Sequence, residues 1–297
     1  MMEPVKRIVE DSGSPLDGEV KYDFPKLIWN LGFILIAIVF APLTFSLSAF
    51  LVFILLTYFS LLIGHSVGMH RMMIHRTFRS NLLIKRALIY IGVLVGMSGP
   101  FGIIKIHDLR DWAQRKKKCH DFFSHKASYL QDVWWQLTSR FEFNSAPKIE
   151  IESEIKDDAF LRFCERTWRW HQLGLCVVLF YLGGWSFVVW GVFVRVAVSV
   201  VGHWTITYFC HNPGPGNWKV KNVSVQASNI RGLGLITYGE CWHNNHHAFP
   251  ESAKIGLEKG QSDPSWWFII LMKKLGLVYD IRLPRSESLR DDLDYVN

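Results

Sequence analysis

The sequence is poor in cysteine and lacks several redox and hydrolase motifs. Its five cysteines are scattered over 297 residues with no C-x-x-C pair. Disulfide frameworks usually show even counts at tight spacing, so we expect five reduced thiols. No cysteine cluster fits an iron–sulfur centre, no G-x-G-x-x-G follows a predicted strand, and no H-E-x-x-H indicates a zinc hydrolase. Any redox chemistry therefore needs electrons from a separate protein.

Charged residues are also scarce, whereas aromatic residues are abundant. Charged residues make up 20% of the chain and hydrophobic residues 49%, compared with roughly 25% charged in an average soluble domain. The chain has 13 Trp, 21 Phe and 9 Tyr, and such rings suit a membrane interface or an apolar tunnel. Residues 1–26 are polar, and the apolar run behind them is too long for a signal core, so we predict no cleavable signal peptide.

Two apolar blocks, residues 27–64 and 173–209, are each long enough for two membrane helices of roughly 20 residues. Pro42 breaks the first block, because proline disfavours helix in the residue before it and has no backbone N–H. Gly183 and Gly184 divide the second block. The sequence therefore predicts four spans in two hairpins, at about 27–45, 46–66, 172–188 and 189–209.

The basic residues predict the orientation of these spans. The two short turns carry no Lys or Arg, so the positive-inside rule places both termini and the polar segments in the cytoplasm. The weaker apolar stretch at 82–106 is interrupted by Gly99 and Pro100, and we interpret it as interfacial, with a fifth span as the alternative. We divide the chain into a cytosolic segment at 1–26, a membrane domain at 27–284 and a polar tail at 285–297.

Twelve histidines are the most informative feature of the sequence. At this histidine content, chance gives about half an H-x4-H pair but only roughly 0.02 copies of H-x2-H-H, so the box at 243–247 is the stronger signal. On a helix its three histidines share one face and can converge on one site. Neutral imidazole is a good ligand for iron, zinc and copper. Other notable histidines, apart from the isolated His65 and His171, are His70, His75, His107, His120, His125, His203 and His211.

Three segments of the chain resemble the membrane fatty acid desaturases that act on acyl-CoA or acyl-lipid substrates. Gly68-Met69-His70-Arg71 with His75-Arg76-Thr77-Phe78 is similar to the first histidine box of that family. The segment from Tyr238 to Pro250 is similar to the third box, and the segment from Asp263 to Asp280 resembles the C-terminal helix. The resemblance covers residues 26–284. It implies an all-α integral membrane fold with four transmembrane helices arranged as two hairpins. A cytosolic helical cap carries the metal site.

The resemblance also implies a non-haem centre of two iron ions held by a set of histidines. The ligands it assigns are His70, His75, His107, His211, His243, His246 and His247.

One motif departs from the family pattern. The second box of the family reads H-x2-H-H, but here Arg110 and Asp111 stand where two histidines are expected after His107. Asp111 lies one helical turn after His107, and a carboxylate suits iron, so we predict that Asp111 helps to fill the gap, with His120 as the alternative. His125, in a segment whose histidine does not bind metal in the family, and His203 are further candidates.

The implied reaction is the oxygen-dependent desaturation of a fatty-acyl chain, with two electrons from a separate donor such as a ferredoxin or a cytochrome b. The basic run from Arg115 through Lys116 and Lys117 to Lys118 is the candidate docking site for that donor. The net charge of +7 also fits a lipid bilayer surface, and we expect no nucleic-acid partner. Candidate residues for an acyl tunnel are Trp134, Trp135, Trp168, Trp170, Trp204 and Trp242.

Three other functions are compatible with parts of the sequence. A membrane di-iron hydroxylase or ketolase shares the histidine boxes and inserts oxygen, and the altered second box is consistent with it. A zinc-dependent membrane hydrolase would need a general base motif that the sequence lacks. A non-enzymatic membrane protein with vestigial boxes is disfavoured by the intact third box.

Overall fold

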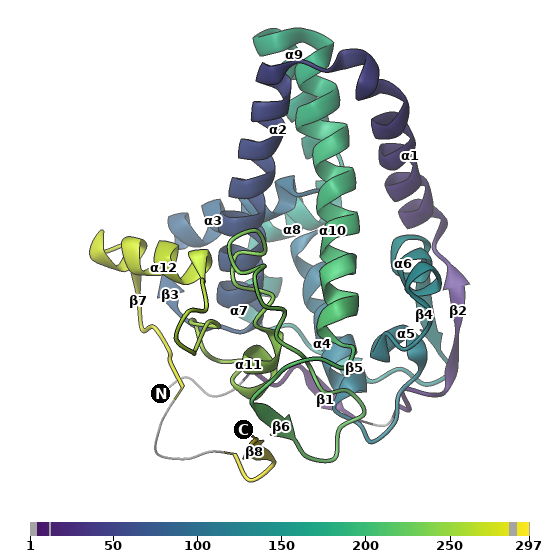
Figure 1. Ribbon diagram of the computed structural model, residues 1–297, viewed down its shortest axis with the longest axis vertical. Helices are drawn as coiled ribbons and strands as arrows, with labels where there is room; N and C mark the ends of the chain where they lie inside the picture. Colours follow the sequence, from purple (N-terminus) through teal and green to yellow (C-terminus); the bar gives the residue numbers. More distant parts are fainter. Residues whose placement is uncertain (1–4, 12, 285–289, 297) are drawn as a thin grey trace.

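Long apolar helices stand side by side in the computed structural model, and the loops and short helices gather at one end of them (Figure 1). The structure describes residues 5–11, 13–284 and 290–296; parts of the predicted terminal segments (1–4, 12, 285–289 and 297) lie outside the described residues. The helices are α1 (Phe24–Phe40), η1 (Pro42–Thr44), α2 (Leu47–Phe59), η2 (Ser60–Ile74), α3 (Leu82–Leu94), α4 (Pro100–Gln114), α5 (Asp121–Ser124), α6 (Tyr129–Thr138), α7 (Ser153–Lys156), α8 (Ala159–Thr167), α9 (His171–Val188), η3 (Val189–Val194), α10 (Arg195–Cys210), α11 (His243–Ala248) and α12 (Pro264–Lys274). The strands are β1 (Ile8–Glu10), β2 (Gly18–Tyr22), β3 (Arg79–Ser80), β4 (Ser139–Phe143), β5 (Lys148–Ile149), β6 (Trp218–Val220), β7 (Val278–Tyr279) and β8 (Leu293–Tyr295).

The first helical hairpin begins and turns at residues that cap helix ends. The Asp23 side chain accepts a hydrogen bond from the Lys26 backbone N–H (3.2 Å), which starts α1. The helix ends before Pro42, which opens the short 3₁₀ turn η1. The Ser46 hydroxyl then accepts from the Ala49 N–H (3.2 Å) and starts α2. The predicted break at Pro42 is therefore confirmed.

The second hairpin turns at two glycines inside α9. Gly183 and Gly184 have φ values of −162° and +64° and leave the helical conformation. The second value lies in the left-handed region that glycine adopts without steric cost, so the predicted division here is confirmed. Among the described residues, two apolar helical runs, Leu47–Ile74 and His171–Cys210, are long enough to cross a membrane, and the latter includes this turn. The apolar helix α1 is shorter.

Helix α3 packs against η2 through glycines. A Cβ added at Gly64 would lie 2.2 Å from the Gly92 nitrogen, and one at Gly68 would lie 2.6 Å from the Leu88 oxygen. Small residues let two backbones approach this closely. The apolar stretch at 82–106 is divided between α3 and α4, and neither helix appears among the candidate spans of the described chain.

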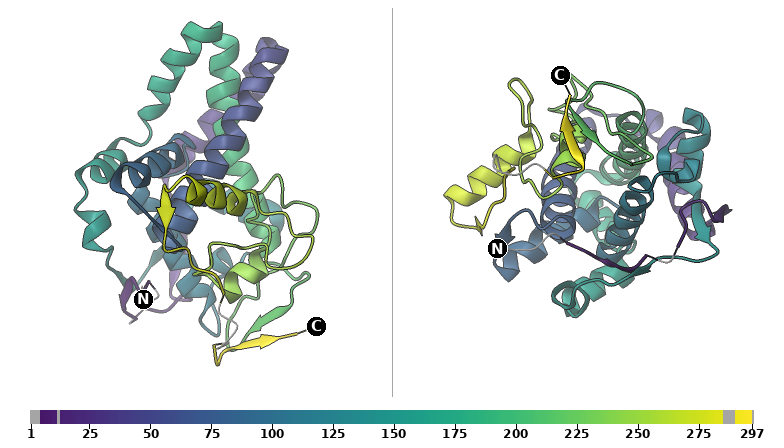
Figure 2. Two further views of the ribbon diagram at one scale, coloured as in Figure 1. Left: turned by 90° about the vertical axis from the view of Figure 1, so that its left-hand side faces the viewer. Right: turned by 90° about the horizontal axis from the view of Figure 1, so that it is seen from below.

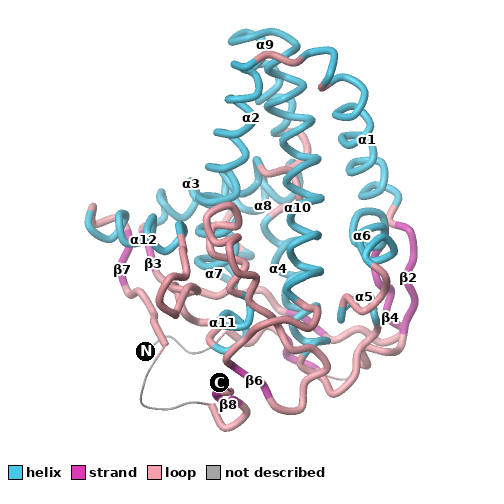
Figure 3. The backbone as a smooth tube through the Cα atoms, viewed as in Figure 1, coloured by secondary structure: helices cyan, strands magenta, loops and turns pink. Residues whose placement is uncertain are grey.

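Short strand pairs hold the loop-rich end of the molecule together, and the prediction of an all-α fold did not include them. The described residues form four antiparallel two-stranded pairings, β1 with β5, β2 with β4, β3 with β7 and β6 with β8. Each pairing joins segments that are distant in the sequence: the strands before α1 pair with β4 and β5, β3 pairs with β7, and β6 pairs with β8 (Figures 2 and 3). The molecule remains mostly helical, and all five cysteines are unpaired, as expected.

We predict that Gly68→Ala destabilises the protein by about 1–3 kcal/mol, because the new methyl group would overlap the backbone of α3. Thermal unfolding of the purified protein in detergent measures the effect. Gly32→Ala in α1 is the matched control, since an added Cβ there meets nothing within 4 Å. Glycine-to-alanine replacement in a helix at such a position should be neutral or stabilising by roughly 0.5–1 kcal/mol. Equal unfolding temperatures for the two variants would contradict the proposed close packing.

Candidate metal centre

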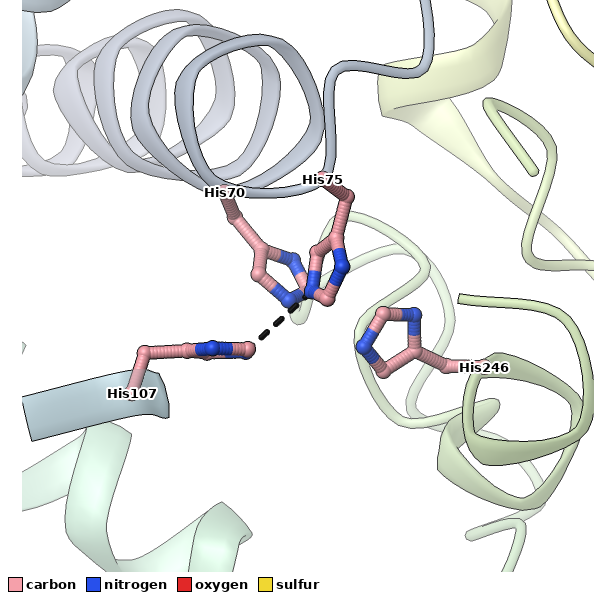
Figure 4. A group of neighbouring side chains, drawn as sticks. All are labelled: His70, His75, His107 and His246. Carbon is pink, nitrogen blue, oxygen red and sulfur yellow. Dashed lines mark hydrogen bonds between the residues drawn. The ribbon is translucent and has the colours of Figure 1, made fainter. Parts of the chain in front are cut away.

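Four histidines from three helices form one cluster at the loop-rich end of the long helices. His70 and His75 come from η2 and the residue after it, His107 from α4 and His246 from α11 (Figure 4). One ring nitrogen from each lies within 4.8 Å of the others. His75 Nε2 and His107 Nε2 lie 3.2 Å apart. We call this group the four-histidine cluster.

The π-helical geometry of η2 explains how an H-x4-H spacing serves one site. In an α-helix, two residues five positions apart point about 140° apart around the axis. In η2 the turns are wider, and the His75 backbone N–H donates to the His70 carbonyl at 3.0 Å, an i to i+5 hydrogen bond. The two rings therefore lie on the same side, with centroids 4.8 Å apart.

A second cluster contains His211, His243 and His247, at the end of α10 and on α11. Nε2 of His243 lies 3.2 Å from both His211 Nε2 and His247 Nε2. We call this group the three-histidine cluster. The expectation that the third box converges on one site was wrong, because His246 joins the four-histidine cluster while its neighbours join this one. The short helix α11 thus lies between two sites and contributes to both.

Acceptors around the clusters orient the rings. His70 Nδ1 lies 2.8 Å from a carboxylate oxygen of Glu240, and His107 Nδ1 lies 3.1 Å from Asp108. His211 Nδ1 donates to the Thr207 carbonyl at 2.7 Å. When Nδ1 is bound in this way, the lone pair of Nε2 is directed at the site, as in the outer contacts of metal-binding histidines. Sequence reasoning missed these partners, since single acidic residues carry no recognisable spacing.

An asparagine network holds α11 in place. The Asn229 side-chain oxygen accepts from the backbone N–H of Asn244 at 3.0 Å. Asn244 Nδ2 donates to the Trp218 carbonyl at 2.8 Å and the Ala227 carbonyl at 2.9 Å. Asn245 Nδ2 donates to the Ile255 carbonyl at 3.0 Å. The two asparagines between the histidines of the third box therefore fix the direction in which those histidines point.

Buried groups also tie the first box to the C-terminal segment. Arg71 lies 2.9 Å from a carboxylate oxygen of Asp263, and it donates to the Ala253 carbonyl at 2.7 Å. Glu240 lies 3.3 Å from Arg71 and also accepts a hydrogen bond from Ser66. Burial alone would raise the pKa of the Glu240 carboxyl, but the adjacent His70 and Arg71 outweigh it and hold the pKa well below its usual range. Glu240 is therefore an ionised acceptor for His70.

The protonation state of the clusters suits metal binding. Burial, followed by neighbouring histidines, lowers the pKa values of His75, His246 and His247 well below their usual range. Burial and Arg110 lower the pKa of His243 to about 3. These rings are neutral at physiological pH, and Nδ1 of His246 is buried without a hydrogen-bond partner among the described residues. Clustered neutral imidazoles with unused lone pairs fit iron, zinc or copper.

The two residues that replace histidines in the second box lie beside the clusters. An oxygen of Asp111 lies 3.9 Å from His107 Nε2. Burial would raise the Asp111 pKa, but His107, Arg110 and Arg115 outweigh it and hold it below its usual range. Arg110 has a buried Nε without a hydrogen-bond partner in the described part of the chain. A carboxylate thus stands at the edge of the four-histidine cluster.

The remaining candidate histidines lie outside the two clusters. His120 accepts a hydrogen bond from the Phe122 backbone N–H at 3.1 Å and packs on Phe141, with ring centroids 4.9 Å apart. His203 contacts His65 in η2, with centroids 5.0 Å apart. His125 contacts His211 of the three-histidine cluster, with ring centroids 5.1 Å apart. His120, the predicted alternative to Asp111, therefore lies in an aromatic cluster with Phe141 and Trp135.

The tryptophan candidates for an acyl tunnel are in varied environments. Trp170 is largely exposed and Trp134 partly so, whereas Trp204 and Trp242 are buried. Trp242 Nε1 donates to the Ser262 carbonyl at 2.8 Å, which gives it a structural role in the loop that carries the third box. Trp135 packs near His120, and Trp168 contacts Trp29 of α1.

The basic run lies at the end of α4, close to the three-histidine cluster. Lys116 pairs with Asp11 at 2.5 Å, while the other three residues of the run are exposed. Arg115 lines a cleft of about 250 Å³ together with Lys221 and His247. A positively charged surface therefore opens toward one of the two clusters.

Comparison with known proteins gives a consistent set of relatives. The family model described as "Fatty acid desaturase" matches residues 44–255. The chain is 29% identical over 263 residues to the acyl-CoA C20 Delta5-desaturase of Anemone leveillei, covering 87% of this chain and 81% of that protein. It is 31% identical over 247 residues to the sn-1 stearoyl-lipid 9-desaturase of Anabaena variabilis, covering 82% and 88%. It is 31% identical over 236 residues to the Delta-9 acyl-lipid desaturase 2 of Arabidopsis thaliana, covering 77% and 73%.

We predict that Asp111→Ala weakens metal binding by about 10–100-fold, the loss typical of a group that supports a metal ligand, or by more if the carboxylate binds the metal directly. The measurement is the metal content and affinity of the purified protein, with a competing chelator. His120→Ala is the matched control, because its ring lies in an aromatic cluster and we expect full metal content. Loss of metal in His120→Ala together with full metal in Asp111→Ala would reverse the assignment.

Proposed function

Because the chain belongs to the fatty acid desaturase family, we propose that it introduces a double bond into the acyl chain of an acyl-CoA or an acyl-lipid. It is an oxidoreductase that acts on fatty acids. The observation that carries the proposal is the pair of histidine clusters formed by residues of the family's boxes. The balanced reaction converts two adjacent methylenes, dioxygen, two electrons and two protons into an alkene and two waters.

The chain's own residues hold the metal ions and orient their ligands in this proposal. The four-histidine cluster, with Asp111 at its edge, holds one iron ion, and the three-histidine cluster holds the other. When bound, the iron pair supplies the oxidising power that removes two hydrogens from the acyl chain. Glu240 and Asp108 keep the Nε2 atoms of His70 and His107 free to bind. Burial of the clusters excludes bulk water from the reacting carbons.

The four long helical segments cross the membrane in this proposal, with both termini and the metal centre on the cytoplasmic side. The two hairpin turns lie at the opposite end of the long helices from α11 (Figure 1) and carry no Lys or Arg, which agrees with the positive-inside rule. Apolar side chains on the outer faces are open to lipid, and such large apolar surfaces mark a membrane contact. Examples are Leu35 (60% exposed), Ile38 (66%), Leu43 (76%), Tyr181 (83%) and Trp185 (68%).

A separate protein supplies the electrons, and the basic run is its docking site in this proposal. The exposed residues Arg115, Lys117 and Lys118 lie where α4 ends, and the first of them shares a cleft with His247. A ferredoxin or a cytochrome b with an acidic face would complement this surface, and opposite charges speed the encounter of two proteins.

Hydroxylation or ketone formation at the same centre is the alternative. The observation that favours it is the replacement of two second-box histidines by Arg110 and Asp111, which changes the charge and the donor atoms around the metal ions. The products separate the two reactions, because a desaturase forms an alkene and a hydroxylase an alcohol.

We predict that a host expressing the protein accumulates a monounsaturated fatty acid that is absent without the gene. Mass spectrometry of total fatty acids, with separate analysis of the acyl-CoA and lipid fractions, measures the product and indicates the acyl carrier. The His246→Ala variant should make none, because ligands of one centre act as a unit. A hydroxylated product without the alkene would favour the alternative reaction.

Elemental analysis of the same preparations tests the metal assignment. Wild-type protein should carry about two iron ions per chain, since the seven clustered histidines are more than one metal ion needs. One zinc ion and no iron would contradict the proposed chemistry.

We predict that the charge reversal Lys117→Glu with Lys118→Glu raises the KM for an acidic donor several-fold at low salt and leaves kcat unchanged. Charges at the edge of an interface mainly affect the rate at which two proteins associate, and salt screens these charges. Turnover with a ferredoxin and with a cytochrome b as donors measures the effect. The matched control is Lys273→Glu with Lys274→Glu, two exposed lysines at the end of α12. An equal effect of both pairs, or of neither, would argue against docking at the basic run.

A further inference from the structure

The three-histidine cluster has one ring fewer than its neighbour, and a fully buried histidine lies beside it. His125 has no exposed surface, and its ring centroid lies 5.1 Å from that of His211. Five of the six ring pairs within the four-histidine cluster have centroids 4.6–5.4 Å apart. His125 therefore stands as close to His211 as the contacting rings of the other cluster stand to one another, and it lies at the edge of the three-histidine cluster on the His211 side.

A buried carboxylate fixes the orientation of His125. Its Nδ1 lies 3.0 Å from each carboxylate oxygen of Asp132, which is itself fully buried. A carboxylate oxygen accepts the hydrogen bond from Nδ1–H, and in this tautomer the lone pair of the ring stands on Nε2. Nε2 is buried and has no hydrogen-bond partner within the described ranges. A carboxylate on one ring nitrogen and a free lone pair on the other is the arrangement of a metal-binding histidine with its outer partner.

The backbone of His125 is tied to the end of α10, from which His211 comes. Asn212 Nδ2 donates to the carbonyls of both His125 and Tyr208, at 2.9 Å each. His125 also has φ of +55°, a left-handed conformation that is uncommon for residues other than glycine. Strained backbone of this kind persists where the surrounding contacts hold it, often at functional sites. The loop at His125 is therefore attached to the cluster by its backbone as well as by its ring.

We propose that His125, oriented by Asp132, supplies a fourth nitrogen ligand to the metal ion held by His211, His243 and His247. The proposal rests on the proposed function only in requiring a metal ion at that cluster. In this proposal, two different residues take the places of the two histidines that the second box lacks. Asp111 lies beside the four-histidine cluster, and His125 lies beside the three-histidine cluster.

The test is the binding of Co²⁺ to protein freed of metal by a chelator, followed by cobalt absorption and by competition with a chelator of known affinity. His125→Asn is the informative variant, because the asparagine amide can still donate to Asp132 while Nε2 is lost. Wild-type protein should bind two Co²⁺ ions. The variant should bind one ion with unchanged affinity and the other at least about 100-fold more weakly, the upper end of the loss seen for outer partners alone.

Matched variants make each outcome decisive. His120→Asn, five positions earlier in the same segment, should bind both ions as the wild type does. Asp132→Asn keeps the side-chain shape and should weaken one ion by about 10–100-fold. Two ions of unchanged affinity in either His125→Asn or Asp132→Asn would overturn the proposal, and the second variant decides if the first fails to fold. Wild-type protein that binds fewer than two ions would instead contradict the proposed two-metal centre.

Discussion

The buried guanidinium of Arg71 joins the parts of the chain that build the metal centre. It contacts Asp263, Glu240 and the carbonyl of Ala253, and so connects η2, the third-box loop and the start of α12. Removing one partner of a buried ion pair typically costs about 3–5 kcal/mol, because the remaining charge is left uncompensated. The main effect of the network is positional. Arg71, the residue after His70, holds the same Glu240 carboxylate that orients His70.

Much of the helical layout could be predicted from the sequence, because its signals are local. Pro42 and the Gly183-Gly184 pair end helices through their own backbone properties, and the structure shows turns at both places. The division of the third box between two sites could not be predicted. Helical periodicity places three histidines on one face, but the direction of each ring depends on Asn229 and on loops distant in the sequence. The strand pairings at the base also join remote segments and leave no local pattern.

The departure at the second box has a different meaning once the structure is considered. In the sequence, Arg110 and Asp111 indicate a centre that lacks two ligands. In the structure, Asp111 stands at one cluster and the His125–Asp132 pair stands at the other. The donor set around the two sites thereby becomes unequal, with an additional carboxylate near one and a carboxylate-supported imidazole near the other. A difference in donor charge generally alters the redox properties of a metal ion, so the two sites need not be equivalent.

In the long helix formed by α2 and η2, the metal-binding histidines His70 and His75 lie in or directly after the π-helical part, η2. The positions of His70 and His75 depend on the wide turns between Ser60 and Ile74, where inserting or deleting one residue would turn the following ring away from the site. The preceding helix α2 carries no ligand of either cluster, so a change in its length would not by itself alter the spacing of His70 and His75. In the proposed membrane arrangement, relatives of this protein could match bilayers of different hydrocarbon thickness by changing the length of α2 together with the helices packed on it, while η2 keeps a constant length.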